Sequence, residues 1–408
     1  MIVQKFGGSS VANAERIMNV ANRIVEGCQK GHQMVIVLSA QGDTTDELLE
    51  KANEINPNPS RREMDMLLTT GEQQSVALMA LALHRLGYPA VSLNAVQAGI
   101  YSTSSYSTAR IKSIKTDRIV RELESKNIVI VTGFQGYNRY GDLTTLGRGG
   151  SDTTAVALAA ALHADLCEIY TDVDGVYTVD PRIVKNARKI DVISYDEMLE
   201  LASLGAKVLN KRSVELAKKY HVELVVRSSL TRAEGTLVKE DTGLEKTLVS
   251  GIAVDKDVAR ISVIGIEDKP GMAFRLFSLL AKKKISVDII IQSIGRDNTK
   301  DISFTVEKAD LQETVRIIEE NKAALHYGKV ATDDKIAKLS IVGAGMANNP
   351  GVASLMFEGL FDAGVNIQMI STSEIKISVL VDEKDADRGA SYVHERFISN
   401  VEIENGGL

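Results

Sequence analysis

The chain has 408 residues, of which 44% are hydrophobic and 25% are charged, and its formal net charge is −6. A chain of this size and composition can bury enough apolar surface for two or three domains. The acidic balance argues against nucleic acid as a partner, because no basic surface is available to neutralise phosphates.

Membrane segments and metal-binding patterns are also missing from the sequence. No apolar run approaches the ~18 residues that a membrane-spanning helix needs. No signal peptide is expected either, since Ile2-Val3 is followed at once by Gln4-Lys5. We therefore expect a cytoplasmic protein without membrane contact. Cys28 and Cys167 lack C-x-x-C spacing and are interpreted as buried free thiols, and no His or Cys cluster predicts a zinc site.

The first predicted strand, residues 2–6, ends in the run K-F-G-G-S-S at residues 5–10. Gly7 and Gly8 would let backbone N–H groups approach an anion closely, and Lys5 adds a full cation. The pattern predicts a phosphate-binding turn, although an ordinary strand-to-helix turn would also fit. It is neither a Walker A motif nor a dinucleotide-binding motif.

Predicted strands and helices then alternate, with strands at residues 34–38, 90–93, 128–132, 167–171 and 222–226 and helices that include residues 14–27, 71–86 and 213–220. This alternation predicts a mainly parallel sheet covered by helices on both faces. Ligands of such sheets gather at the carboxyl ends of the strands. Lys5, Ser39, residues 133–134 and residues 171–172 lie at or just past such ends.

A second glycine turn, G-R-G-G-S-D-T-T at residues 147–154, opens the predicted helix 155–162. Ser151 or Asp152 could cap this helix. Capping does not account for Arg148, whose guanidinium suits a carboxylate or a polyphosphate, while Asp152 could hold Mg²⁺ or orient cationic groups. A third segment, residues 170–182, follows a predicted strand, is dense in turn residues and is interpreted as a binding loop.

The last third of the chain repeats itself after a predicted connector at residues 232–248. The Pro-Gly turns at residues 270–271 and 350–351 are 350 − 270 = 80 residues apart, and each is framed by the same order of strand, turn, helix, strand and strand. The repeats predict two small α+β domains. They could bind a ligand or serve only dimerisation.

Taken together, the motifs at residues 5–10, 38–48, 70–72, 148–152 and 171–182 resemble those of the amino acid kinase family, and in particular its aspartate kinases. The repeats resemble ACT domains, which are ferredoxin-like modules that bind amino acids. The resemblance covers essentially the whole chain. One departure is Asn210-Lys211, where relatives usually have His-Pro.

The resemblance implies an α/β fold: a three-layer α/β/α kinase domain with a mainly parallel sheet, followed by two ferredoxin-like ACT domains. The implied boundaries are residues 1–240 for the kinase domain, 241–260 for a connector and a strand given to the second ACT unit, 261–332 for ACT domain 1 and 333–408 for ACT domain 2. The strand in the connector is expected near residues 249–254, because one ACT unit is inserted in the other in aspartate kinases.

The implied reaction is transfer of the ATP γ-phosphoryl group to the β-carboxylate of L-aspartate, the first step of lysine, threonine and methionine biosynthesis, with Mg²⁺ as cofactor. Because a carboxylate is already ionised at pH 7, no general base is needed. By resemblance, the catalytic residues are Lys5 and Asp152, and the substrate-binding residues are Ser39, Thr45, Glu72 and Arg148. The nucleotide would contact Lys5, Gly7, Gly8, Ser9, Gly149, Ser151, Thr171, Asp172, Tyr177, Arg182 and Lys207.

The resemblance also implies feedback control and an oligomer formed through ACT domains, either of one kind of chain or of two. The expected effector is lysine, with threonine as a possible co-effector, and it would lie near Asp268, Gln292, Asn366 and Ile367. Two alternatives stay open. The first is another small-molecule kinase of the family that phosphorylates glutamate, acetylglutamate or a nucleoside monophosphate. The second is an amino-acid sensor without kinase activity.

Overall fold

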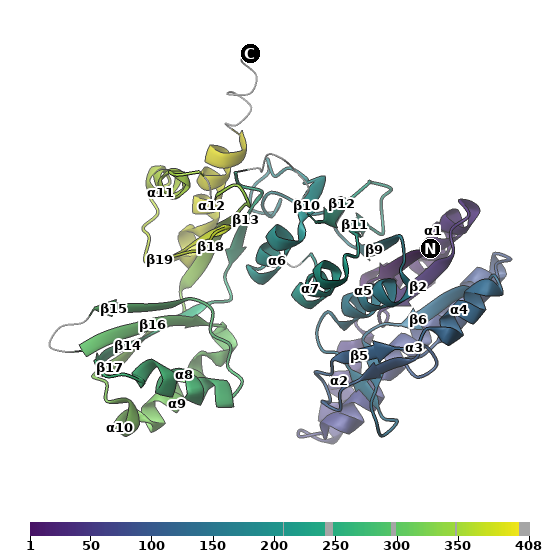
Figure 1. Ribbon diagram of the computed structural model, residues 1–408, viewed down its shortest axis with the longest axis horizontal. Coiled ribbons are helices and arrows are strands. Elements are labelled where there is room, and N and C mark those ends of the chain that lie inside the picture. Colours follow the sequence, from purple (N-terminus) through teal and green to yellow (C-terminus); the bar gives the residue numbers. More distant parts are fainter. Residues whose placement is uncertain (207, 241–247, 295–298, 347–348, 400–408) are drawn as a thin grey trace, which may run out of the picture. The chain divides into compact units, whose positions relative to one another are not determined.

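The computed structural model describes residues 1–408 except 207, 241–247, 295–298, 347–348 and 400–408 (Figure 1). The chain forms two compact units. The first contains Met1–Tyr177, Lys189–Ser203 and Lys207–Leu244, and the second contains Thr178–Arg188, Leu204–Ala206 and Glu245–Leu408.

An eight-stranded sheet forms the centre of the first unit. In spatial order its strands are β10 (Val192–Ser194), β12 (Thr236–Lys239), β11 (Leu224–Ser228), β9 (Leu166–Thr171), β1 (Ile2–Phe6), β2 (Met34–Leu38), β6 (Ile128–Thr132) and β3 (Ala90–Leu93). All neighbours are parallel except β11 and β12. The central strands β2 and β6 are buried along their whole length, as parallel strands with both faces covered must be.

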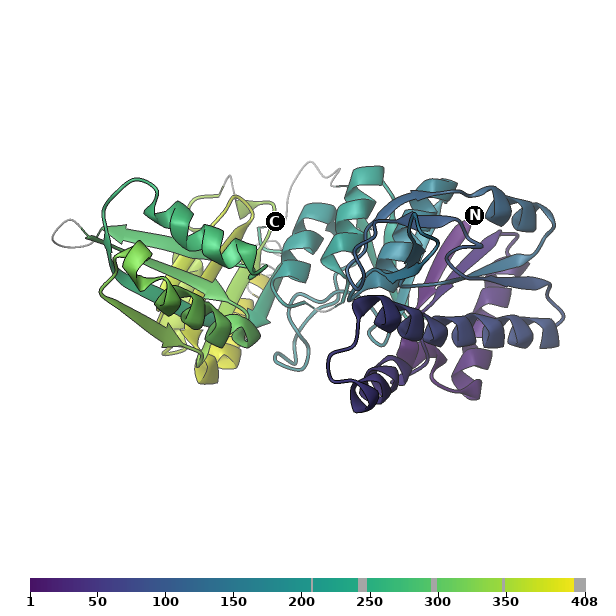
Figure 2. The ribbon, with the colours of Figure 1, turned by 90° about the horizontal axis from the view of Figure 1, so that it is seen from below.

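Helices cover both faces of this sheet. The amphipathic helix α1 (Ala14–Gln29) and the long helix α3 (Arg61–Arg85) pack together on one face; α3 is dark blue in Figure 2. Helix α5 (Gly150–Leu162) packs against β1, β2 and β9. The other helices of the unit are α2 (Thr44–Ile55), α4 (Asp117–Glu124), α6 (Tyr195–Ser203) and α7 (Lys211–Tyr220). A small second sheet has the order β5 (Ile111–Ile114), β4 (Ile100–Ser102), β7 (Gln135–Tyr137) and β8 (Leu143–Thr145).

The second unit holds two four-stranded antiparallel sheets. The first has the order β15 (Ile290–Ile294), β16 (Thr299–Val306), β14 (Ala259–Glu267) and β17 (Lys329–Asp333), and its helices are α8 (Met272–Lys282), α9 (Leu311–Glu320) and α10 (Lys322–Leu325). Helices α8 and α9, green in Figure 2, pack together beside this sheet. The second sheet has the order β13 (Gly251–Asp255), β18 (Ile336–Val342), β20 (Lys376–Asp382) and β19 (Met369–Thr372), with α11 (Val352–Asp362) and α12 (Ala386–His394).

The two repeats begin their helices in the same way. Gly271 precedes α8 with φ +91°, and Gly351 precedes α11 with φ +98°. Both values lie in the left-handed region, where glycine avoids the clash of a Cβ atom. The repeated Pro-Gly turns therefore make the same sharp entry into a helix.

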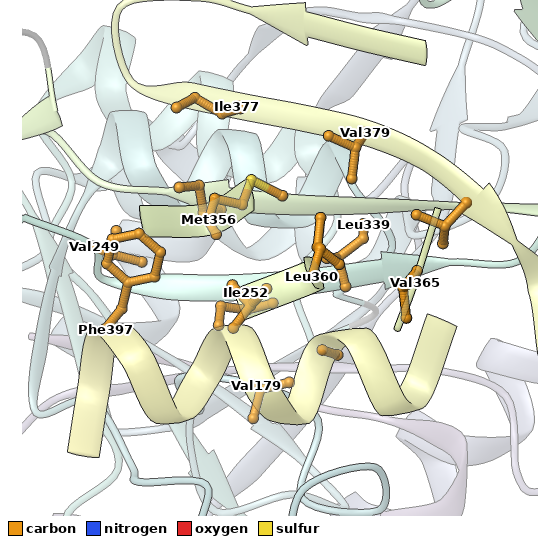
Figure 3. Packing of buried hydrophobic residues seen from close by; sticks show 14 of the residues in the cluster. Val179, Val249, Ile252, Leu339, Met356, Leu360, Val365, Ile377, Val379 and Phe397 are labelled. Carbon is orange, nitrogen blue, oxygen red and sulfur yellow. The ribbon is translucent and has the colours of Figure 1, made fainter. Parts of the chain in front are cut away.

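Segments from distant parts of the chain complete the second sheet and its core. Strand β13 precedes the whole first repeat, yet it pairs with β18 of the second. Val179 and Val184 are buried in the same cluster as Ile252, Leu339 and Met356 (Figure 3 shows Val179 with the other three). Residues 178–188 are thus part of the core of the second unit, although they follow a strand of the first.

The predicted fold class is confirmed, while three local predictions are wrong. Helix α3 starts at Arg61 and not near Gly71, because Ser60 Oγ accepts a hydrogen bond from Glu63 N and caps it ten residues earlier, 71 − 61. Thr236–Lys239, interpreted as part of a connector, forms strand β12 between β10 and β11. Cys28 is half-buried, whereas Cys167 is buried as expected.

Among the helices that the structure describes, none is long and apolar enough to span a lipid bilayer.

Candidate active site

Four parallel strands end at one edge of the large sheet, and the predicted motifs meet there. Backbone hydrogen bonds join the segments just past these ends: Gly7 N donates to Tyr170 O at 3.3 Å, Ser39 N donates to Phe6 O at 3.2 Å, and Gly133 N donates to Leu38 O at 2.9 Å. The turns after β1, β2, β6 and β9 therefore lie side by side, as expected for a ligand site at the carboxyl ends of a parallel sheet.

A nearly buried ion pair lies at the centre of this edge. Lys5 Nζ is 2.7 Å from Asp152 Oδ1, and the two side chains are only 12% and 11% exposed. Lys5 comes from the end of β1 and Asp152 from the first turn of α5. The two glycine turns, far apart in the sequence, are thus joined by opposite charges.

Asp152 does not cap α5, and neither does Ser151, so that prediction is wrong. The capping position is Gly149, and among the described residues no side chain makes a capping hydrogen bond to this helix. Asp152 instead faces Lys5, and Ser151 Oγ accepts a hydrogen bond from Ser39 Oγ at 3.0 Å. The start of α5 therefore keeps N–H groups that an anion could use.

The glycine turn after β1 has no room for a side chain at Gly8. A Cβ atom on Gly8 would lie 2.6 Å from the carbonyl oxygen of Ala40, and one on Gly7 would lie 3.6 Å from Lys5 Nζ. Ser9 belongs to the 3-10 turn Gly8–Val11 that follows. The backbone of this turn therefore packs closely against the turn after β2 and beside the Lys5 ammonium group, as a phosphate-binding turn requires.

Glu72 is a buried carboxyl group next to the turn after β2. It lies in the middle of α3 and is 3% exposed. Its oxygens accept hydrogen bonds from Ala40 N at 3.3 Å and from Gln135 Nε2 at 3.2 Å. Burial raises the pKa of Glu72 to about 7. Thr45 is half-buried in the first turn of α2, which packs against α3 where a Cβ on Gly71 would lie 3.5 Å from Thr44.

Arg148 is exposed on the arginine turn, residues 147–149, which leads into α5. Asn210 holds this turn. Asn210 Nδ2 donates to Arg148 O at 3.2 Å, while Asn210 Oδ1 accepts from Arg212 N at 3.0 Å and caps α7. Gly149 has φ +69°, and a Cβ there would lie 2.2 Å from Asn210 Nδ2. Asn210, in the pair Asn210-Lys211 that stands where relatives usually have His-Pro, therefore still caps α7. It also contacts the arginine turn.

The residues after β9 that are expected to contact the nucleotide bond to near neighbours in the chain. Thr171 Oγ1 donates to Asp172 Oδ1 at 2.9 Å directly after β9, and Tyr177 OH donates to Asp174 Oδ1 at 2.8 Å. Arg182 belongs to the second unit, is 89% exposed, and pairs with Asp180 at 2.6 Å. Lys207 lies outside the described residues, so the roles of Arg182 and Lys207 stay predictions.

Comparison with known proteins identifies the family. Residues 1–228 match the amino acid kinase family, and residues 261–321 and 339–397 match the ACT domain. The chain is 54% identical over 398 residues to an aspartokinase of Geobacillus stearothermophilus, with 97% of both chains covered. The chain belongs to the aspartate kinases of the amino acid kinase family.

Solved structures agree with this assignment. Aspartokinase III of Escherichia coli in complex with aspartate and ADP, in an R state, is 26% identical, has a TM-score of 0.82, and is matched over 97% of this chain and 99% of that one. The same enzyme in complex with lysine and aspartate, in a T state, is 26% identical, has a TM-score of 0.76, and is matched over 98% and 99%. The expectation of an aspartate kinase with tandem ACT domains is confirmed.

The predicted effector residues lie in both ACT-like halves of the second unit. Asp268 pairs with Lys300 at 2.8 Å, and Gln292 is exposed on β15. Asn366 is exposed before β19, and Ile367 packs on the core of the second half. The fold thus gives each half one part of the predicted set, and effector binding stays a prediction.

The described residues contain no group of three or more His, Cys, Asp or Glu side chains that could hold a metal ion. Mg²⁺ in phosphoryl-transfer enzymes is usually held by one or two carboxylates together with substrate phosphates. The carboxylate of Asp152, in the second glycine turn, fits a magnesium ion of that kind.

Two residues of the site were not expected from the sequence. Gln135 supports Glu72 from β7, and Asp65 binds the segment that leads to Arg148. Asp65 precedes Glu72 by two helical turns, so the helical spacing of the two acids was a usable signal. Their partners, however, follow 63 and 80 residues later along the chain.

Proposed function

We propose that the protein transfers the γ-phosphoryl group of ATP to the β-carboxylate of L-aspartate, giving 4-phospho-L-aspartate and ADP. The observation that carries this proposal is the nearly buried Lys5–Asp152 pair between two glycine turns, with the buried Glu72 close by. This arrangement supplies a cation for phosphoryl oxygens and a carboxylate for an ammonium group. Both are needed when a small amino acid is phosphorylated.

The proposed division of labour follows from charge. Lys5 neutralises phosphoryl oxygens, assisted by N–H groups of Gly7, Gly8 and Ser9, since positioning and charge stabilisation supply most of the catalysis in phosphoryl transfer. Asp152 holds the Lys5 ammonium group in place. A Mg²⁺ ion bound with the nucleotide would neutralise further charge on the phosphates. Proposed further nucleotide contacts are Gly149, Ser151, Thr171, Asp172, Tyr177, Arg182 and Lys207.

The amino acid would be held at both ends. Glu72 binds its ammonium group and Arg148 its α-carboxylate, because charge-assisted hydrogen bonds are the strongest available to a small zwitterion. Ser39 and Thr45 contact the substrate between these charges. In this arrangement the β-carboxylate needs no general base, since it is ionised at neutral pH.

We also propose feedback control by lysine, with threonine as a second candidate effector, at Asp268, Gln292, Asn366 and Ile367. The T-state complex of the Escherichia coli enzyme with lysine supports this proposal. The exposed edge strands β15 and β19 would then serve an oligomer formed through ACT domains, either of identical chains or with a second kind of chain. The physiological role would be the first step toward lysine, threonine and methionine.

An assay of ADP formation tests the main proposal. ATP and Mg²⁺ are supplied with aspartate, glutamate, acetylglutamate or a nucleoside monophosphate in parallel reactions. The proposal expects turnover that depends on aspartate and exceeds the other reactions clearly. Faster turnover with another acceptor would assign the protein a different substrate, and no turnover with any of them would favour a sensor.

A further inference from the structure

Asp65 is a fully buried acid in the first turns of α3. Its side chain is 0% exposed, and no Lys or Arg forms an ion pair with it in the described part of the chain. A buried carboxylate without a cation is costly unless its oxygens are well hydrogen-bonded. The reason for keeping an acid at this position must therefore lie in its hydrogen-bond partners.

Five hydrogen bonds from two residues converge on Asp65. Ser107 N lies 3.0 and 2.9 Å from the two carboxylate oxygens, and Ser107 Oγ donates at 3.3 Å. Thr145 donates from both its backbone N and its Oγ1, each at 2.9 Å. Asp65 thus fastens α3 to the loop around residue 107 and to the last residue of β8.

The loop held in this way lies against the arginine turn. Ser107 has φ +66°, a left-handed conformation that costs a non-glycine residue free energy and must be held by its surroundings. A Cβ on Gly147 would lie 3.2 Å from Ser107 O, and Ala109 N donates to Thr145 O at 2.9 Å. Asp65 therefore binds both segments that lie next to Gly147, the loop around residue 107 and the end of β8. Gly147 is the residue before Arg148.

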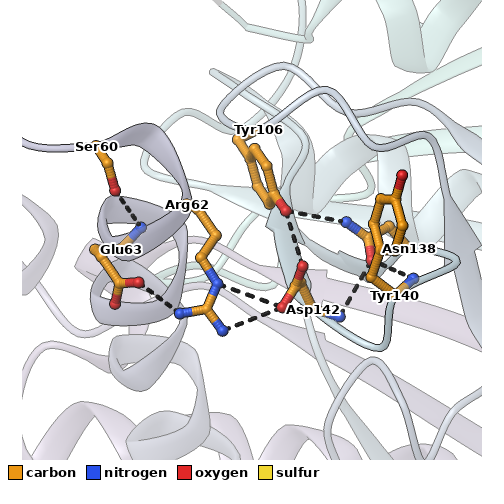
Figure 4. A network of polar contacts seen from close by, with 7 residues as sticks. All are labelled: Ser60, Arg62, Glu63, Tyr106, Asn138, Tyr140 and Asp142. Carbon is orange, nitrogen blue, oxygen red and sulfur yellow. Dashed lines mark hydrogen bonds and ion pairs between the residues drawn. The ribbon is translucent and has the colours of Figure 1, made fainter.

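A second, more exposed set of contacts also connects α3 to the loop around residue 107 and to the start of β8. Arg62 donates to Asp142 through Nε at 3.3 Å and Nη2 at 3.1 Å, and Tyr106 OH donates to Asp142 Oδ2 at 2.8 Å (Figure 4). These groups are partly exposed, so their ion pair is weak. Asp65 is the buried residue among these contacts, and it binds the end of β8, the strand that leads to the arginine turn.

Helix α3 also carries Glu72, 72 − 65 = 7 residues further on. At 1.5 Å per residue this places the two acids about 10 Å apart along a rigid helix. One helix therefore fixes the proposed ammonium-binding group and, through Asp65, the segment that leads to the proposed carboxylate-binding group.

We propose that Asp65 is a positioning residue that sets the position of Arg148 relative to Glu72, and that it thereby governs the binding of the amino acid rather than of ATP. This inference rests on the proposed function. It adds a positioning residue that does not itself touch the substrate.

The test compares Asp65→Asn with the wild type. Asn keeps the size of the side chain but turns one acceptor into a donor that faces N–H groups. A displacement of about 1 Å in a positioned group can cost 100-fold in rate. We therefore expect kcat/KM for aspartate to fall about 100-fold and the KM for ATP to change less than about twofold.

Two further variants separate positioning from mere stability. Met79→Ala removes a buried side chain from the same helix that packs on α1 and the sheet, so it destabilises the fold without touching the arginine turn. Thr145→Val removes one of the five hydrogen bonds and serves if Asp65→Asn does not fold. It is expected to lower kcat/KM for aspartate by a smaller factor, again with little change in the KM for ATP.

The proposal is overturned if the folded Asp65 or Thr145 variant keeps the wild-type kcat/KM for aspartate, lowers it no more than Met79→Ala does, or raises the KM for ATP as much as the KM for aspartate. Failure of the proposed function would be seen separately, as absence of aspartate-dependent turnover in the wild-type protein.

Discussion

The charged residues of the site differ in how they tolerate burial. Lys5 and Asp152 form an ion pair at 2.7 Å, so each offsets part of the cost of burying the other. Glu72 has no such partner among the described residues and is held only by neutral donors. Its proton affinity is therefore raised, and the binding of an ammonium group would restore a favourable charge pairing.

This difference predicts a pH-dependent stability that comes from Glu72. Its pKa is raised from 4.5 to about 7 by burial, so the folded state holds the proton more tightly than the unfolded state. The stability contributed at low pH is lost as the pH rises from about 4.5 to about 7, by about 3 kcal/mol in total. Glu72→Gln should lose this dependence.

Denaturant unfolding of both proteins at pH 5 and pH 8 measures the effect. The variant should gain stability relative to the wild type between pH 5 and pH 8. A constant difference between the two proteins across this range would show that Glu72 titrates normally. Glu63→Gln, an exposed change on the same helix, is the control, and it should leave the pH dependence of the unfolding free energy as in the wild type.

At the scale of elements, the site depends on how helices α3, α5 and α7 are anchored at their starts. Asn210 is informative because its two side-chain atoms have separate tasks. Oδ1 caps α7, and Nδ2 holds the carbonyl of Arg148. A helix cap of this kind is worth about 1 kcal/mol.

Two substitutions separate these tasks. Asn210→Asp keeps the capping oxygen and removes the donor, so its stability should stay near wild type while the KM for aspartate rises several-fold. Asn210→Ala removes both, and should lose about 1 kcal/mol of stability in addition. Thermal unfolding and steady-state kinetics of both variants check this. Equal kinetics for Asn210→Asp and wild type would show that the contact with Arg148 does not position the turn.

The elements that the sequence predicted best are those with local causes. The strand ends at Phe6 and Leu38 and the two glycine turns follow from apolar runs and from glycine's freedom near a close backbone neighbour. The start of α3 was missed because a continuous apolar face begins only after Gly71. Strand β12 was missed since four residues acquire their strand partners only in the folded sheet.

The same distinction applies to the site. Lys5 and Asp152 were predicted because each lies in a recognisable turn. Asp65 is linked to Glu72 only by helical spacing, and its partners Ser107 and Thr145 are 42 and 80 residues away. Long-range hydrogen bonds of this kind leave almost no trace in a single sequence.

At the scale of the whole molecule, the chain joins a kinase unit to a unit built from two ACT-like halves. Residues 178–188 leave the sheet of the first unit and add Val179 and Val184 to the core of the second. The segment interpreted as a nucleotide-binding loop is therefore covalently continuous with the regulatory fold. Coupling between distant ligand sites typically amounts to about 1–3 kcal/mol.

Feedback control predicts a specific effect of two exposed residues. Gln292→Ala or Asn366→Ala should move the inhibition curve for lysine to higher concentration and leave the uninhibited kcat close to wild type, because neither residue lies in the kinase unit. Inhibition curves with lysine, threonine and both together measure this. If none of these inhibits or binds the intact protein, the ACT-like halves are better regarded as an assembly interface.

The most direct test of the whole account is the rate of aspartate-dependent ADP formation in the wild type and in Lys5→Met. Removal of one preorganised charge-stabilising group costs about 3–4 kcal/mol of barrier, so turnover should fall by a factor of hundreds. The double variant Lys5→Met/Asp152→Asn removes the unpaired acid and controls for folding. It should unfold like the wild type and stay equally inactive. Turnover near the wild-type rate in folded Lys5→Met protein would contradict the account.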